Sequence, residues 1–293
     1  MRPLSAEALS TVAGTVPTPT YDRRQVRTGI VHIGVGGFHR AHQAAYLDQL
    51  MNEGKALDWG ITGIGLLPHD RHMHEVMTAQ DCLYTMVVKH PDGSLHPRVV
   101  GSIVHYLFAP DDPEAVLELM SDPGTRIVSL TITEGGYLVH PVTGEFDSDD
   151  PATQKDLRPD STPTTAFGFI TEALSRRRER GLHPFTVMSC DNIPGNGEVA
   201  HKMIGAFARL KDPELADWLE REVSFPNSMV DRITRSPRTR TGPCSPTSSG
   251  SRTPGRSSVS RSPNGRWKTT SVPVAHLSRT SASRWSTTSS PTS

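Results

Sequence analysis

Short apolar runs and amphipathic segments alternate along the first four-fifths of the chain. Four runs rich in Ile, Val, Leu and Met predict buried strands, at residues 30–33, 59–67, 126–133 and 185–189. Helical patterns lie between these runs. Because parallel strands need crossover helices, the alternation predicts a doubly wound α/β domain of the Rossmann type over residues 1–234.

Three segments between the predicted strands carry helix signals. Residues 41–51 place four large apolar side chains at three- and four-residue spacing, namely Tyr46, Leu47, Leu50 and Met51. This spacing predicts that they pack against the sheet. Asp112 before Pro113 predicts a capped helix start. Residues 164–180 end in a basic turn followed by Gly181, which predicts a helix and its stop.

A glycine-rich turn joins the first predicted strand to the first predicted helix. Here backbone N–H groups can approach the oxygens of a pyrophosphate. The third glycine of the G-x-G-x-x-G fingerprint would stand at position 39, where this chain has histidine. A tight connection without a ligand is the alternative. The candidate coenzyme-binding residues are Gly34, Val35, Gly36, Gly37, Phe38 and His39.

Polar residues follow the other predicted strands. Asp70 lies after the second one, 33 residues beyond Gly37, where a carboxylate would accept hydrogen bonds from the adenosine ribose and favour NAD over NADP. A solvated loop aspartate is the alternative. Thr133 ends the third strand and Glu134 follows it, and both are further candidate coenzyme-binding residues. Asn192 follows the fourth strand. Since ligands bind outside the carboxyl ends of open parallel sheets, we expect these side chains near one another.

Composition divides the chain near residue 234. Residues 235–293 contain ten Lys and Arg, no Asp or Glu, 17 Ser, 10 Thr and 7 Pro, so the formal net charge of +0 hides an acidic body and a basic tail. This composition cannot bury enough apolar surface to offset ordering, and it predicts a disordered tail.

The cysteine count and the lack of targeting signals suggest a compartment. Cys82, Cys190 and Cys244 are odd in number and show no metal-type pairing, which favours a reducing environment and predicts no metal site. The sequence contains no apolar stretch of membrane length and no signal-peptide core. We therefore expect a cytoplasmic protein without a membrane partner.

Four blocks of the body resemble the mannitol dehydrogenase family of long-chain polyol dehydrogenases. They are residues 34–42 (GVGGFHRAH), 131–137 (TITEGGY), 189–192 (SCDN) with Asn196 and Gly197, and 225–234 (FPNSMVDRIT). The resemblance covers residues 1–234 and includes His39. It implies metal-independent hydride transfer between NAD(H) and a polyol/ketose pair such as D-mannitol and D-fructose. It also implies a Rossmann domain, a helical C-terminal domain, and a monomer or weak oligomer.

The resemblance also implies roles for single residues. Asn192 would help to polarise the reacting oxygen, Glu134 would stand at the mouth of the proton path, and Asp70 would select NAD. Asp231 is placed in the catalytic site by resemblance alone. The family's general base is a lysine in a K-x-x-x-x-N-x-x-H segment, which these 293 residues do not contain. Because one positioned base contributes about 10²- to 10⁴-fold, we expect weak turnover or none.

The tail fits a reading-frame error after Thr234. Residues 260–270 permit codons that read EPFTQWALEDD when read one base earlier, and residues 271–293 permit a second family-like string in the same frame. We therefore predict that residues 235–293 are the correct gene translated in a shifted frame. An unbroken frame at the locus, with peptides from these residues in the expressed protein, would contradict this hypothesis.

Other functions are open at this point. Within the enzyme class, arabinitol dehydrogenase and the uronate reductases resemble the same first domain. A non-catalytic NAD-binding remnant is a further alternative. The basic tail could bind nucleic acid, with a steep salt dependence, but it contains no recognisable nucleic-acid motif. The sequence thus favours a small-molecule polyol or ketose as the partner over a nucleic acid.

Overall fold

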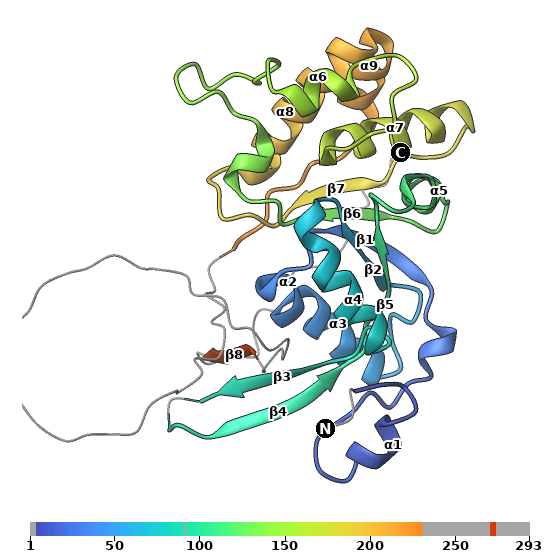
Figure 1. The fold of residues 1–293 in the computed structure, drawn as a ribbon, viewed down its shortest axis with the longest axis vertical. Coiled ribbons are helices and arrows are strands. Elements are labelled where there is room, and N and C mark those ends of the chain that lie inside the picture. The colour runs from blue at the N-terminus through green and yellow to red at the C-terminus, as the bar shows by residue number, and fades with distance from the viewer. Residues whose placement is uncertain (1–3, 91, 231–269, 274–293) are drawn as a thin grey trace, which may run out of the picture.

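A five-stranded parallel sheet forms the centre of the molecule. A computed structural model describes residues 4–90, 92–230 and 270–273. The strands are β1 (Thr28–Ile33), β2 (Gly60–Gly65), β5 (Ile103–Phe108), β6 (Ile127–Leu130) and β7 (Thr186–Ser189), in the spatial order β5-β2-β1-β6-β7 (Figure 1). From β1 the chain runs first to one side of the sheet and later to the other, so the topological switch point lies between β1 and β6. The predicted doubly wound fold is confirmed.

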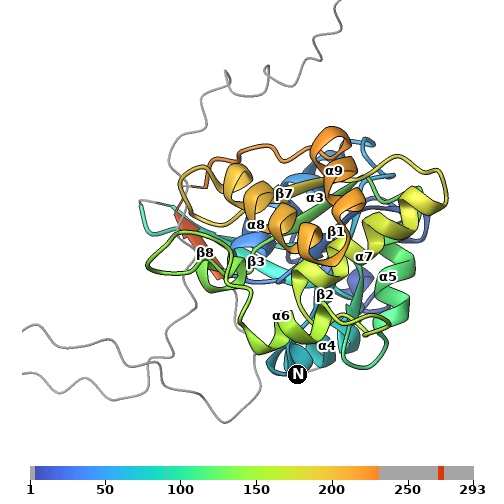
Figure 2. The same cartoon turned by 90° about the horizontal axis from the view of Figure 1, so that it is seen from above.

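Helices cover both faces of this sheet. On one face lie α5 (Pro113–Ser121), α7 (Ala166–Glu179), α8 (Asn196–Lys211) and α9 (Pro213–Glu222) (Figure 2). On the other lie α2 (Gly37–Ala41), α3 (Gln43–Asn52) and α4 (Arg71–Ala79). Alternation along β1 sends Val31 and Ile33 to the first face and Ile30 to the second. Shorter helices are α1 (Leu9–Val12), α6 (Pro151–Asp156), η1 (Arg23–Gln25), η2 (Pro68–Asp70) and η3 (Glu134–Tyr137).

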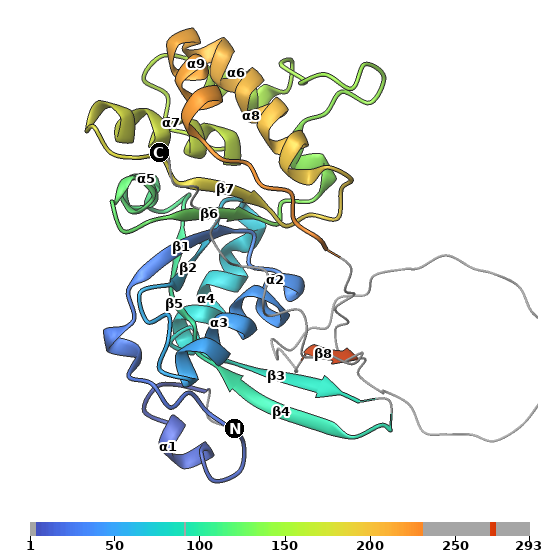
Figure 3. The same ribbon diagram turned by 180° about the vertical axis from the view of Figure 1, so that it is seen from behind.

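A second, smaller sheet projects from the body. The strands β3 (Tyr84–Lys89) and β4 (Leu95–Val100) form an antiparallel hairpin, and β8 (Thr270–Pro273) pairs with β3 in parallel (Figure 3). The four residues of β8 belong to the segment that the sequence predicts to be disordered. The other residues of that predicted tail lie outside the described part of the chain.

The first helix differs from its prediction. Residues 37–52 form two helices, because His42, with φ −120° and ψ −86°, ends α2 before α3 begins. The expected apolar face is also wrong in part, since the side chains of Tyr46 and Leu50 are 48% and 40% exposed. The side of α3 that packs inward carries Ala44, Ala45, Asp48 and Met51. The helix rotates in this way because the Asp48 carboxylate accepts hydrogen bonds from Tyr21 and from the backbone of Gly101.

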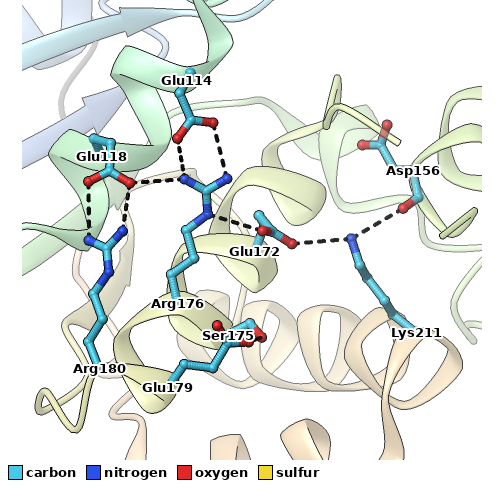
Figure 4. A network of polar contacts seen from close by, with 9 residues as sticks. All are labelled: Glu114, Glu118, Asp156, Glu172, Ser175, Arg176, Glu179, Arg180 and Lys211. Atoms are coloured by element: carbon cyan, nitrogen blue, oxygen red, sulfur yellow. Dashed lines mark hydrogen bonds and ion pairs between the residues drawn. The ribbon is translucent and has the colours of Figure 1, made fainter. Parts of the chain in front are cut away.

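Arginines at the end of α7 tie it to α5. Arg176 pairs with Glu114 and Glu118, and Arg180 also pairs with Glu118 (Figure 4). Arg177 is different: it is only 4% exposed and donates to four backbone carbonyls, those of His183, Met120, Asp122 and Thr125, at 2.7 to 3.2 Å. These hydrogen bonds join the C-terminal end of α7 to the end of α5 and to the loops that follow the two helices. Arg177 therefore does more than complement the dipole of α7.

Candidate coenzyme-binding site

The fold itself requires glycine at position 34. Gly34 has φ +90°, and a Cβ there would lie 2.2 Å from the carbonyl oxygen of Thr131 on the neighbouring strand segment. The Thr131 hydroxyl donates to the Gly34 carbonyl at 2.5 Å, and the Gly34 N–H donates to the Ile64 carbonyl at 3.2 Å. The turn after β1 is therefore held from both sides, by the chain after β6 and by β2.

Gly36 is different, because the protein does not need glycine there. Its φ is −88°, a value that any residue adopts, and a Cβ would meet nothing nearer than the Gly34 carbonyl oxygen at 3.7 Å. The residue is exposed at the carboxyl edge of the sheet. A glycine that the packing does not require leaves open space in front of the backbone, which is how the second glycine of a dinucleotide turn admits a pyrophosphate.

His39 stands where the third glycine of the fingerprint would be, and it stacks on His32 of β1. The ring centroids are 3.4 Å apart and the planes differ by 10°. A third glycine normally allows the helix to approach the strand closely. Here a second histidine fills the gap instead, so the departure from the fingerprint is a packed aromatic pair and the turn keeps its shape. The side chain of His39 is 1% exposed.

Both histidines are held neutral. Nε2 of His32 contacts the Gly34 carbonyl at 3.2 Å, and because a carbonyl only accepts, Nε2 carries the proton. Nδ1 lies 2.8 Å from the Ser129 hydroxyl oxygen. Burial lowers the pKa of His32 to about 3. Burial also lowers the pKa of His39 well below its ordinary value, and the charges of His32 and Arg40 act in the same direction.

Asp70 lies at the end of β2, as predicted. Its Oδ2 accepts from the Leu67 N–H at 2.9 Å, which begins η2. Its side chain is partly exposed, and its Oδ1 lies 3.7 Å from Nε2 of His69. The neighbouring Arg71 is engaged elsewhere, in a bidentate pair with Asp111. One carboxylate oxygen is thus available to a ribose hydroxyl, and a phosphate there would meet negative charge.

The remaining predicted residues lie at the ends of β6 and β7. Thr133, Glu134 and Asn192 are all exposed. No hydrogen bond involving the Glu134 or Asn192 side chain is found within residues 4–90, 92–230 and 270–273, so both are available to a ligand. Asp231 lies outside the described residues.

Two further residues organise this edge, and the sequence analysis has them only as members of the family-like blocks. Asp191 is buried beneath Asn192 and accepts hydrogen bonds from the chain that leaves β6. Asn227 accepts from the N–H of Gly197 at 2.8 Å and so caps α8, whose own N-cap residue, Gly195, offers no side chain. Their roles could not be predicted from residue spacing, because their partners are backbone groups from distant segments.

Within the part of the chain that the structure describes, no helix is both long and apolar enough to cross a bilayer. In the same residues, no three His, Cys, Asp or Glu side chains are grouped as a metal ion would require.

Comparisons with known proteins agree with this geometry. The family model described as the mannitol dehydrogenase Rossmann domain matches residues 28–247. A mannitol 2-dehydrogenase from Pyricularia oryzae is 52% identical over 227 residues, which are 77% of this chain and 45% of that protein. A polyol:NADP oxidoreductase from Gluconobacter oxydans is 48% identical over 233 residues, 79% of this chain and 48% of that one.

A solved structure is similar as well. The ternary complex of Pseudomonas fluorescens mannitol 2-dehydrogenase with NAD and D-mannitol superposes with a TM-score of 0.77 and 49% identity, over 81% of this chain and 48% of that one. The chain thus spans about half the length of the curated relatives it matches. The chain belongs to the mannitol dehydrogenase family, and its described body contains the Rossmann domain of that family.

Proposed function

We propose that this chain is the coenzyme-binding half of an NAD(H)-dependent polyol dehydrogenase. The observation that carries the proposal is Gly36, a glycine that the fold does not require and that leaves the backbone open at the switch point of the sheet. The matching relatives are named for mannitol and other polyols, which supports a polyol/ketose pair such as D-mannitol and D-fructose as substrate.

In this proposal each residue has a defined task. The turn at Gly34 to Gly37 holds the pyrophosphate, and Asp70 accepts from the adenosine ribose. Asn192 donates to the reacting oxygen, and Glu134 leads the proton toward solvent. NAD, when bound, supplies the hydride acceptor. Because the lysine base that the family resemblance implies is not among these 293 residues, we expect them alone to oxidise mannitol weakly or not at all.

The Gly36→Ala variant tests the proposal. The added methyl group occupies the space meant for the pyrophosphate, so we expect the affinities for NADH and for ADP-ribose each to fall about tenfold or more. Since the methyl group meets no protein atom closely, the free energy of unfolding should change by less than about 0.5 kcal/mol. The affinities are measured by titration, followed by NADH fluorescence or by heat. The free energy of unfolding is measured by urea unfolding.

The matched control is Gly205→Ala in α8, where a Cβ also meets nothing within 4 Å but which lies away from the turn. This variant should bind NADH as the parent does. A parent chain that binds neither NADH nor ADP-ribose would overturn the proposed function.

Asp70→Asn tests the choice of coenzyme. Removing the negative charge weakens the hydrogen bonds to the ribose and removes the repulsion of a 2′-phosphate. We expect the ratio of the dissociation constants for NADPH and NADH to fall by about tenfold or more. Glu75→Gln, an exposed carboxylate on the next helix, should leave the ratio unchanged. An unchanged ratio in Asp70→Asn would remove Asp70 from the site.

The proposed location and the proposed substrate are supported and tested separately. Cys82 and Cys190 are free thiols, which supports a reducing, cytoplasmic location. A frame-corrected full-length protein assayed on mannitol, arabinitol, sorbitol and fructuronate would identify the substrate and separate the arabinitol and uronate alternatives. Equilibrium binding of NADH without turnover by that protein would favour a non-catalytic remnant.

A further inference from the structure

A single buried carboxylate links the ends of β6 and β7. Asp191 follows β7 and is 8% exposed. Its Oδ2 accepts from the Ile132 N–H at 3.0 Å, and its Oδ1 accepts from the Thr133 N–H at 2.9 Å. The hydroxyl of Tyr137 donates to Oδ2 at 2.8 Å. Both carboxylate oxygens of Asp191 therefore accept hydrogen bonds from the chain that leaves β6.

The chain that Asp191 holds is strained. Thr133 has φ +64° and ψ 167°, a region that is essentially reserved for glycine. A β-branched residue keeps this conformation only where its surroundings impose it. The two hydrogen bonds to Asp191 act on the peptide groups before Thr133, at the point where the chain turns into η3. The hydrogen bonds to Asp191 therefore account for the strained backbone of Thr133, and this backbone conformation sets the position of Glu134.

The backbone of Asp191 is fixed as well. Its carbonyl accepts from the Asn196 side chain at 3.0 Å. The hydroxyls of Tyr137 and Ser189 lie 2.6 Å apart and close the network from below. Burial and the charge of Asp191 together raise the pKa of Tyr137, which stays a donor. Asn192 comes directly after this anchored residue, so the same carboxylate sets the position of both exposed side chains, Glu134 and Asn192.

The switch-point geometry says which part of a coenzyme meets this edge. Asp70, at the end of η2 after β2, and the glycine turn after β1 belong to the adenosine and pyrophosphate half of a dinucleotide site. The other mononucleotide half of such a fold lies over the strands on the far side of β1, which here are β6 and β7. The ends of β6 and β7 therefore face the nicotinamide riboside.

We propose that Asp191 is a positioning residue for the nicotinamide end of the coenzyme: its carboxylate holds Thr133 in the strained conformation that places Glu134 and Asn192 there. This inference rests on the proposed function. It assigns Asp191 no contact with the coenzyme, only the placement of the candidate coenzyme-binding residues Thr133 and Glu134 and of Asn192 beside them.

The test compares two ligands on the full chain. ADP-ribose contains the adenosine and pyrophosphate parts of NADH but not the nicotinamide. In Asp191→Asn one acceptor oxygen becomes a donor, so the N–H groups of Ile132 and Thr133 can no longer both be bound. We expect the affinity for NADH to fall about tenfold while that for ADP-ribose stays within about twofold. The fluorescence change of bound NADH should shrink as the nicotinamide loses its fixed surroundings.

Asp156→Asn is the matched control. Asp156 is another buried carboxylate that accepts from two backbone N–H groups, those of Thr164 and Thr165, at the start of α7. Its loss should lower stability as that of Asp191 does, yet leave the ratio of the two affinities unchanged. Equal loss of both ligands in Asp191→Asn, or loss of neither, would overturn the proposal.

Thr133→Gly keeps the proposal testable if Asp191→Asn does not fold. Glycine adopts the observed φ without strain, so we expect a higher melting temperature together with a selective loss of NADH affinity, because the turn is no longer stiff. A Thr133→Gly protein that binds NADH as tightly as the parent would contradict the inference. If the parent binds ADP-ribose and the variants bind both ligands as the parent does, only the role of Asp191 is rejected. If the parent binds neither ligand, the proposed function is rejected as well.

Discussion

Gly34→Ala is expected to lower the free energy of unfolding by about 4 kcal/mol. A side chain at φ +90° costs about 1 to 2 kcal/mol by itself. The larger part of the loss comes from the carbonyl oxygen of Thr131, which would lie 2.2 Å from the new Cβ and belongs to rigid backbone beside β6. The turn and the strand end must separate, which breaks the hydrogen bond between them. Urea unfolding followed by circular dichroism measures the loss.

Gly36→Ala, two residues on, is the internal control for this result. It adds the same methyl group to the same turn without a close contact, so its unfolding should match that of the parent. The two variants therefore separate a glycine needed by the protein from a glycine needed by the ligand. A Gly34→Ala protein as stable as the parent would show that the turn has another conformation.

Acid is expected to destabilise the protein well above the range in which carboxylates titrate. The folded state keeps His32 and His39 neutral, with the pKa of His32 at about 3, whereas an unfolded histidine has a pKa of about 6.5. Since the folded pKa is the lower one, this stability is complete above pH 6.5 and is lost as the pH falls toward 3. Protonation of His32 costs about 1.4 kcal/mol of stability per pH unit below about 6.5, or about 2 kcal/mol at pH 5, and His39 acts in the same direction.

The histidine contribution is measured as a difference between variants. His39→Gln removes one titrating ring and should lower the slope of unfolding free energy against pH between 6 and 5. His69→Gln, on a side chain that is 74% exposed, should leave the slope unchanged. Asp48 acts in the opposite direction because burial raises the pKa of its carboxyl, and it is the same in all three proteins. Equal slopes in the parent and His39→Gln would contradict the buried neutral pair.

The strands that position the site could be predicted because each is a compact apolar run ending in polar or glycine residues. Residues 59–67 and 185–189 contain β2 and β7, and the glycine turn follows β1 as expected. Residues 126–133 were expected to be one strand, but β6 ends at Leu130. The strand ends early because the Asp191 carboxylate takes the N–H groups of Ile132 and Thr133, which a longer ladder would have used.

The features that the sequence did not reveal depend on distant partners. The hairpin of β3 and β4 was not expected, since its apolar residues are mixed with charged and polar ones. The edge strand β5 was also not predicted, although residues 103–108 are apolar except for His105. Tyr46 and Leu50 have a helical spacing, but the buried carboxylate of Asp48 turns another side of α3 inward. His39 looked like a defect of the fingerprint because its stacking partner, His32, lies on the strand and belongs to no motif.

The cap that Asn227 places on α8 ties residues 223–228 to the Rossmann domain. The last helix stops at Glu222, but Gly197 approaches the backbone of Phe225 and Pro226 so closely that a Cβ would lie 2.6 Å away. Ser228 then exchanges hydrogen bonds with the Asn196 side chain. Two sequence blocks that stand some thirty residues apart are thus one interlocked unit. An excised domain should extend through Ser228. A boundary at the end of α9 would remove the residues that cap the first turn of α8.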